Sequence, residues 1–81
     1  MSERLPRYAY TVLLDPWEEG SGYTVTVPAL PGCITQGKTK AEALARAREA
    51  IACHVKGLLV DGEEVPFEKR HPILTKVAVE L

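Results

Sequence analysis

The stretch that decides the fold is residues 28–43, which read PALPGCITQGKTKAEA. Leu30-Pro31-Gly32 predicts a tight turn, because proline fixes its own φ and the glycine after it tolerates a positive φ. Residues 33–36 are long enough for one short strand, and a glycine closes it. Thr39 is placed as a helix N-cap, with Glu42 three residues later as in a capping box. This stretch predicts a turn, a strand and the start of a helix in direct succession.

The apolar residues that follow this stretch are spaced as they would be on one face of a helix. They recur at steps of four and three, which predicts an amphipathic helix over about residues 40–60. Asp61-Gly62 ends this helix, with the glycine as a left-handed cap. The residues of the predicted apolar face are Leu44, Ala47, Ile51, Val55 and Leu58.

Three further strands are predicted outside the central stretch. Residues 8–14 and 23–27 are aromatic and β-branched, and the glycine-containing loop between them indicates an antiparallel hairpin. Residues 63–72 form a loop with two prolines, and residues 73–81 form a last strand. Because a right-handed crossover places that strand parallel to an earlier one, we expect a mixed sheet. The fold class is α+β, a two-layer β-β-β-α-β sandwich with one helix across one face, and residues 1–81 form a single domain.

Composition excludes several classes of protein. The chain has 81 residues with 10 basic and 11 acidic side chains, so it lacks the basic surplus of an electrostatic nucleic-acid binder. Two cysteines are too few for a disulfide scaffold. No stretch has the length of a signal peptide core or a membrane span, so we expect a cytoplasmic location and no membrane partner. A chain this short buries little surface alone, which favours a dimer or a higher even-numbered oligomer.

The chemistry-bearing residues do not form a catalytic set. A metal-dependent nuclease needs converging carboxylates, and the last predicted strand offers only Glu80. Cys53 and His54 are neighbours on a helix, so their side chains diverge. Cys33 and His54 could act as nucleophile and general base only if the turn that carries Cys33 packs against the helix that carries His54. We therefore predict no enzyme, and no catalytic, cofactor-binding or metal-binding residue.

The stretch from residue 28 to 43 resembles the signature of HicB-like antitoxins, and the resemblance extends over about residues 8–81. The pattern reads roughly P-x-L-P-G-C-x-T-x-G-x-T-x-x-E-A, and every fixed position is matched. We interpret these residues as determinants of the fold, not as contacts to a partner. They are Pro28, Leu30, Pro31, Gly32, Cys33, Thr35, Gly37, Thr39, Glu42 and Ala43.

The resemblance implies a partial ribonuclease-H-like fold and an antitoxin function. Such antitoxins bind a small ribonuclease toxin of the HicA type and occlude its active site. Longer relatives also carry a helix-turn-helix or ribbon-helix-helix segment, which is not found in these 81 residues, so we expect no direct DNA binding by this chain. Two alternatives stay open: a homo-oligomeric binding module without a toxin partner, and a residual ribonuclease-H-like nuclease, which the scattered carboxylates disfavour.

An antitoxin of this kind must compete with RNA for a basic ribonuclease, and acidic groups on its surface suit that task. Two predicted loops carry them, one between the first two strands and one after the helix. In the first loop a tryptophan is either a partner anchor or folded back on the sheet. The candidate partner contacts are Asp15, Trp17, Glu18, Glu19, Asp61, Glu63, Glu64 and Glu68.

Overall fold

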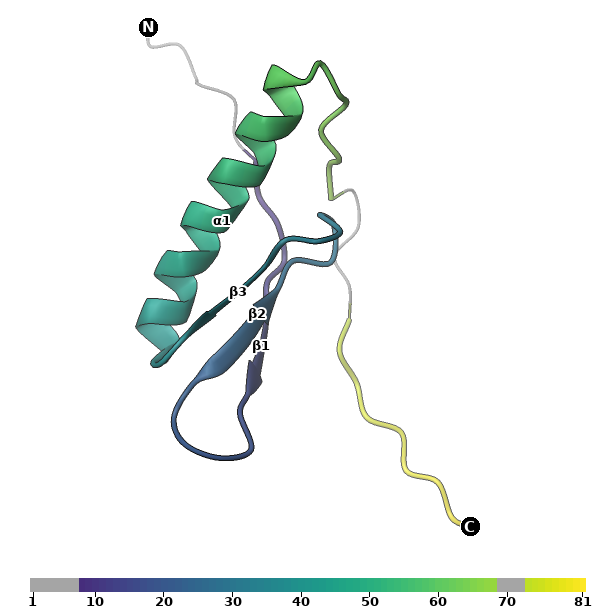
Figure 1. The fold of residues 1–81 in the computed structure, drawn as a ribbon. Coiled ribbons are helices and arrows are strands. Elements are labelled where there is room, and N and C mark those ends of the chain that lie inside the picture. The colour runs from purple at the N-terminus through teal and green to yellow at the C-terminus, as the bar shows by residue number, and fades with distance from the viewer. Residues whose placement is uncertain (1–7, 69–72) are drawn as a thin grey trace, which may run out of the picture.

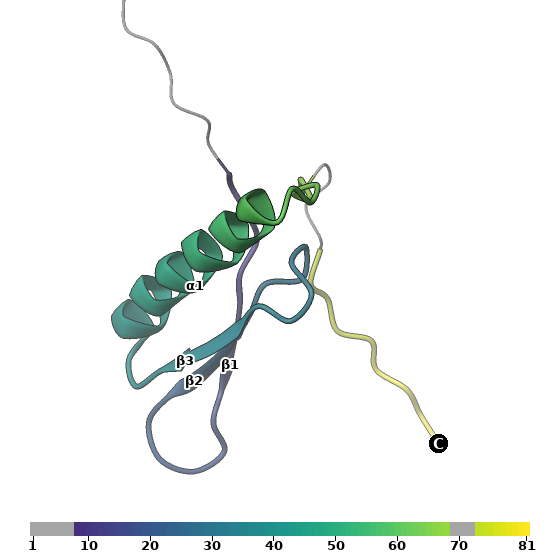
Figure 2. The same ribbon diagram turned by 45° about the horizontal axis from the view of Figure 1, so that its top comes forward.

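The computed structural model describes residues 8–68 and 73–81. The elements in chain order are β1 (Leu13–Pro16), β2 (Tyr23–Thr26), β3 (Ile34–Gly37) and α1 (Lys40–Val60). The strands form one antiparallel sheet in the order β1-β2-β3, and α1 packs against one face of it (Figure 1, Figure 2). The predicted α+β class is confirmed.

The first hairpin is confirmed, but its first strand lies further along the chain than predicted. The predicted strand 8–14 ends before Pro16, whereas β1 runs through Pro16 and pairs it with Tyr23. The Trp17 backbone N–H donates to the Gly22 carbonyl at 2.9 Å. Since inward and outward backbone groups alternate along an antiparallel strand, the nitrogen of Pro16 faces the free edge. No N–H is needed there, so the strand tolerates the proline.

The predicted turn between β2 and β3 is confirmed, and it is anchored in the core. The Leu30 backbone N–H donates to the Val27 carbonyl at 3.0 Å, and the Cys33 N–H donates to the Leu30 carbonyl at 2.9 Å. Gly32 has a φ of 87°, which favours glycine. The Leu30 side chain is fully buried. The turn therefore ties β2 to β3 and fills the core at the same point.

The ends of α1 are also confirmed. The Thr39 hydroxyl accepts from the Glu42 backbone N–H at 3.0 Å. The Glu42 carboxylate reaches back to the Lys38 N–H at 2.6 Å, so it satisfies a donor one residue before the N-cap. At the other end Gly62 has a φ of 72° and follows the C-cap Asp61. Local sequence signals therefore determine both ends of this helix.

Four of the five residues of the predicted apolar face of α1 are buried or packed against the core, and only Leu44 differs. The fully buried helix residues are Ala43, Ala47 and Val55, whereas Leu44 is 40% exposed. The reason is how closely the helix approaches β3. A Cβ atom on Gly37 would lie 2.4 Å from the Ala43 backbone nitrogen, so position 37 has no room for a side chain and the first turn of the helix lies directly on β3. The buried face is rotated away from Leu44 toward the alanines.

The core lies between α1 and the sheet in two adjoining clusters. The first joins the β2–β3 turn to the second half of the helix and to the segment that follows it. The second joins β2 to the first half of the helix, with half-buried Val12, Leu14 and Tyr23 against it. The buried residues are Val27, Leu30, Cys33, Val55 and Val65 in the first cluster and Val25, Ala43 and Ala47 in the second.

The prediction of a fourth strand over residues 73–81 in a mixed sheet is wrong for this structure. The sheet is three-stranded and wholly antiparallel, and the described order is β-β-β-α. Residues 73–81 form no strand, and both views show them running away from the sheet. Their alternation predicts how the segment would lie within a sheet, but it does not specify an edge to pair with.

Candidate interaction site

The two predicted acidic loops lie at opposite ends of the molecule. The β1–β2 loop is at one end, and the segment that follows α1 is at the other (Figure 1). The structure therefore does not bring the two groups together into one surface. In both groups most of the carboxylates are exposed: Asp15, Glu18 and Glu19 in the first, and Asp61, Glu63 and Glu64 in the second.

Trp17 is folded back against its own hairpin. Its indole Nε1–H donates to the Thr24 hydroxyl at 3.1 Å. The ring lies over Gly22, where a Cβ atom would come within 2.3 Å of a ring carbon. Gly22 has a φ of 155°, and it leaves the space that the ring fills. Of the two interpretations left open by the sequence, this geometry favours the one in which Trp17 stabilises the loop.

Glu68 is engaged within the chain. Its carboxylate accepts from the Thr11 backbone N–H at 2.6 Å and from the Thr11 hydroxyl. Nearby, the Tyr10 hydroxyl donates to the Pro66 carbonyl at 2.6 Å. Together with buried Val65, these bonds tie the segment after α1 to the chain that leads into β1. Glu68 is therefore a poor candidate for a partner contact, although the sequence predicts it as one.

This tie has a predicted pH dependence. Burial raises the pKa of Tyr10, and the neighbouring Tyr8 and Glu68 raise it further. Because the folded pKa lies above the unfolded value near 10, the stabilisation is complete below pH 10 and is lost as the pH rises through the folded pKa.

We expect a Tyr10→Phe variant to lose about 1 kcal/mol of unfolding free energy at neutral pH, because the bond to Pro66 is removed. Urea titrations at several pH values should show a shallower fall above pH 10 in this variant than in the wild type, since its position 10 no longer ionises. Equal slopes in the two proteins would show that ionisation of Tyr10 does not cause the loss of stability above pH 10.

The cysteines are poorly placed for nucleophilic chemistry. Cys33 is buried, and burial raises the pKa of its thiol, with a smaller contribution from Cys53. The reactive form of a cysteine is the thiolate, which a raised pKa disfavours. Cys53 is exposed and His54 is half-buried. Within residues 8–68 and 73–81, no group of three or more metal-ligating side chains is assembled.

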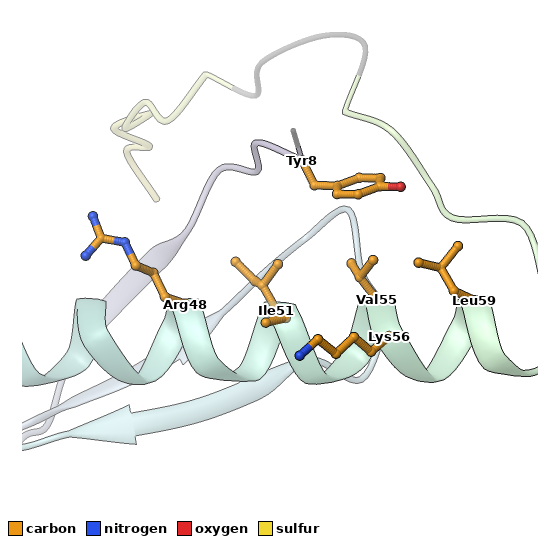
Figure 3. Close-up of a pocket in the computed structure, with 7 residues that line it drawn as sticks. Tyr8, Arg48, Ile51, Val55, Lys56 and Leu59 are labelled. Atoms are coloured by element: carbon orange, nitrogen blue, oxygen red, sulfur yellow. The ribbon is translucent and has the colours of Figure 1, made fainter. Parts of the chain in front are cut away.

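An open apolar groove, which the sequence analysis missed, runs along one flank of α1. It has a volume of about 660 Å³. The Tyr8 ring stands over the helix above Val55 and faces Ile51 and Leu59 (Figure 3). A signal for it was present in the sequence, because apolar Leu59 lies one turn after Val55, beside the predicted apolar face. The full lining is Tyr8, Arg48, Ile51, Ala52, Val55, Lys56 and Leu59.

These features describe a small α+β domain with candidate surfaces for binding. In the described part of the chain, no helix has the length and apolar character needed to span a membrane. The model of a family described as "HicB_like antitoxin of bacterial toxin-antitoxin system" matches residues 10–78. The chain belongs to this HicB-like antitoxin family.

Individual relatives agree with this assignment. A UPF0150 protein of Thermoplasma acidophilum is 47% identical over 64 residues, which are 79% of this chain and 91% of the relative. Antitoxin HicB 1 of Photorhabdus laumondii is 42% identical over 58 residues, 72% of this chain and 37% of the relative. Antitoxin HicB of Escherichia coli K12 is 39% identical over 58 residues, 72% of this chain and 41% of the relative. The chain thus matches less than half the length of the relatives that are named antitoxins.

Proposed function

We propose that this protein is an antitoxin that binds and inhibits a small RNA-cleaving toxin of the HicA type. The observation that carries the proposal is the family match over residues 10–78, which include all three strands and the helix. The relatives named HicB antitoxin align with this same kind of domain over 58 residues. We therefore assign the inhibitory function to the domain that this chain shares with them.

The exposed carboxylates supply a physical basis for binding such a toxin. An RNA-cleaving enzyme must attract a polyanion, so an acidic surface can compete for the same basic groups. Glu63 and Glu64 are exposed beside the end of α1. The carboxylates of the β1–β2 loop are also exposed, but Lys38 and Lys40 line the hollow beside that loop. Because these lysines offset the negative charge, we propose the segment after α1 as the main contact.

The proposal is tested by co-expression with the product of an adjacent toxin-like reading frame. The wild-type chain should co-purify with that product and relieve its toxicity. We expect Glu63→Lys/Glu64→Lys to weaken binding by about 10-fold or more, because rim charges are reversed. Glu18→Lys/Glu19→Lys should have a smaller effect. Glu49→Lys is a matched control, because Glu49 is exposed on α1 outside both loops.

The outcomes separate the function from its location. If the wild type neither co-purifies with the toxin-like product nor relieves its toxicity, the antitoxin proposal fails. If it binds and both loop variants bind as tightly as the control, the function stands and the proposed contact surface is wrong.

A second candidate is a homo-oligomeric binding module without a toxin. It is favoured by the apolar groove and by the exposed apolar side chains of residues 73–81. Such a module would self-associate in the absence of any toxin and would leave the toxicity of the adjacent gene product unchanged.

A further inference from the structure

The segment after α1 is held at the end where it leaves the helix. The Glu63 backbone N–H donates to the Leu58 carbonyl at 2.9 Å, which closes the last turn of α1. Two residues later, Val65 is buried in the core. Glu64 lies between these two fixed points, and its side chain is exposed like that of Glu63. The acidic pair therefore stands on a short piece of backbone that is anchored on its helix side.

The far end of the same segment is held by the chain that leads into β1. The Tyr10 hydroxyl donates to the Pro66 carbonyl at 2.6 Å. Thr11 donates twice to the Glu68 carboxylate, once from its backbone N–H at 2.6 Å and once from its hydroxyl. Residues 61–68 have no helix or strand pairing of their own beyond the end of α1. Their path after Val65 therefore depends on this tie.

An aromatic contact adds to the tie. The Tyr8 ring stacks on the Phe67 ring, with centroids 5.8 Å apart and planes inclined by 19°. Phe67 is 64% exposed, so its position is fixed by this ring contact more than by burial in the core. Removing one contact of the tie should loosen the segment without opening the core around Val65.

The order of this segment matters for binding. A segment that is already ordered in the free protein loses less conformational entropy when a partner binds, so more of the interaction energy appears as affinity. Two carboxylates also attract a basic partner most effectively when both are held in one place. The tie supplies this order next to Glu63 and Glu64.

We infer that the tie fixes the position of the Glu63–Glu64 pair for toxin binding, and that Thr11 is a positioning residue for this contact. The inference rests on the proposed function, because it deepens the account of the same binding surface. Thr11 acts through Glu68, without touching the toxin itself. Its hydroxyl is the part of the tie that can be removed with the least change of shape, because valine has nearly the same outline as threonine.

The first test compares two substitutions of Thr11 in the full chain. Thr11→Val keeps the shape and loses the hydroxyl, whereas Thr11→Ser keeps the hydroxyl and loses a methyl group. Binding to the product of the adjacent toxin-like reading frame should weaken about 5-fold in Thr11→Val, as for the loss of one hydrogen bond, and stay near the wild type in Thr11→Ser. A role in packing alone predicts the reverse order. Thr26→Val is the matched control, because Thr26 is a half-buried threonine of β2 outside the tie.

The second test follows the segment in the free chain, without any toxin. NMR order parameters of the Glu64, Val65 and Phe67 amides should fall in Thr11→Val and stay near the wild-type values in Thr11→Ser. Those of the α1 interior should be unchanged in both variants, and circular dichroism should confirm an intact helix. Unchanged order parameters in Thr11→Val would overturn the inference.

The third test asks whether Thr11 acts through the acidic pair. Thr11→Val is combined with Glu63→Lys/Glu64→Lys, and the affinities of the four proteins form a double-mutant cycle. Once the two charges are reversed, holding them in place no longer helps binding. Thr11→Val should then change the affinity by less than about 2-fold, in contrast to its roughly 5-fold effect in the wild type.

Failure of the proposed function and failure of this inference give different results. If the wild type does not bind the toxin-like product, the antitoxin proposal fails and the inference falls with it. If the wild type binds and Thr11→Val binds as tightly, the function stands and the inference is overturned. It is also overturned if Thr11→Val weakens binding equally with and without the charge reversals.

Discussion

A Gly37→Ala variant is expected to lose about 3 kcal/mol or more of its unfolding free energy. The added Cβ would lie 2.4 Å from the Ala43 backbone nitrogen and 2.6 Å from its Cα. Both are backbone atoms, so relief requires α1 to move away from β3. That movement would also open the contacts of buried Ala43 and Ala47. Urea unfolding followed by circular dichroism measures the loss, which is a large share of the stability of a domain this small.

The same substitution at Gly57 is the matched control. Gly57 lies inside α1, and a Cβ atom there would meet nothing within 4 Å. Gly57→Ala should therefore raise the unfolding free energy by about 1 kcal/mol through helix propensity. Effects of the same sign at the two glycines would contradict the close approach of α1 to β3.

The second large loss of unfolding free energy is expected for a Leu30→Ala variant. The Leu30 side chain is 0% exposed and belongs to the cluster that joins the β2–β3 turn to α1 and to Val65. Leu30→Ala removes buried methyl groups and leaves a cavity, which costs about 2–5 kcal/mol. The loss should appear as a lower denaturation midpoint with a nearly unchanged m-value, because the folded shape is retained.

Val60→Ala provides the comparison for Leu30→Ala. Val60 ends α1 and is 85% exposed, so its truncation should change the unfolding free energy by no more than about 0.5 kcal/mol. If Leu30→Ala were as mild as this control, the β2–β3 turn would not be anchored in the core.

The parts of the fold that were predictable from sequence are those specified by neighbouring residues. Thr39 and Glu42 stand three residues apart, and their bond closes at 3.0 Å. Gly62 follows directly on the end of α1 with the positive φ that the cap needs. Such signals act within one turn of chain, so a single sequence contains all the information they require.

The errors arise where the packing of one element on another, or the register of a strand pair, decides the structure. The buried face of α1 follows Ala43 in preference to Leu44 because Gly37 and Ala43 are in close contact. Strand β1 passes through Pro16 because its register turns the proline nitrogen toward the free edge. Neither the helix-to-strand distance nor the register is visible in a periodic pattern.

The candidate site likewise has features that could be predicted from the sequence and features that could not. The acidic character of the two loops could be predicted, and Glu63 and Glu64 are exposed as expected. The engagement of Glu68 with Thr11 could not, because 57 residues separate them. The groove along α1 depends on the distance between Tyr8 and the helix flank, which also requires the folded structure.

The most direct test of the antitoxin function is RNA cleavage in a purified system. The product of the adjacent toxin-like reading frame is incubated with RNA while the wild-type chain is titrated in. Cleavage should fall to background near one equivalent of chain, and Glu63→Lys/Glu64→Lys should require a clear excess. Undiminished cleavage in the presence of excess wild-type chain would contradict the assignment of this protein as the inhibitor.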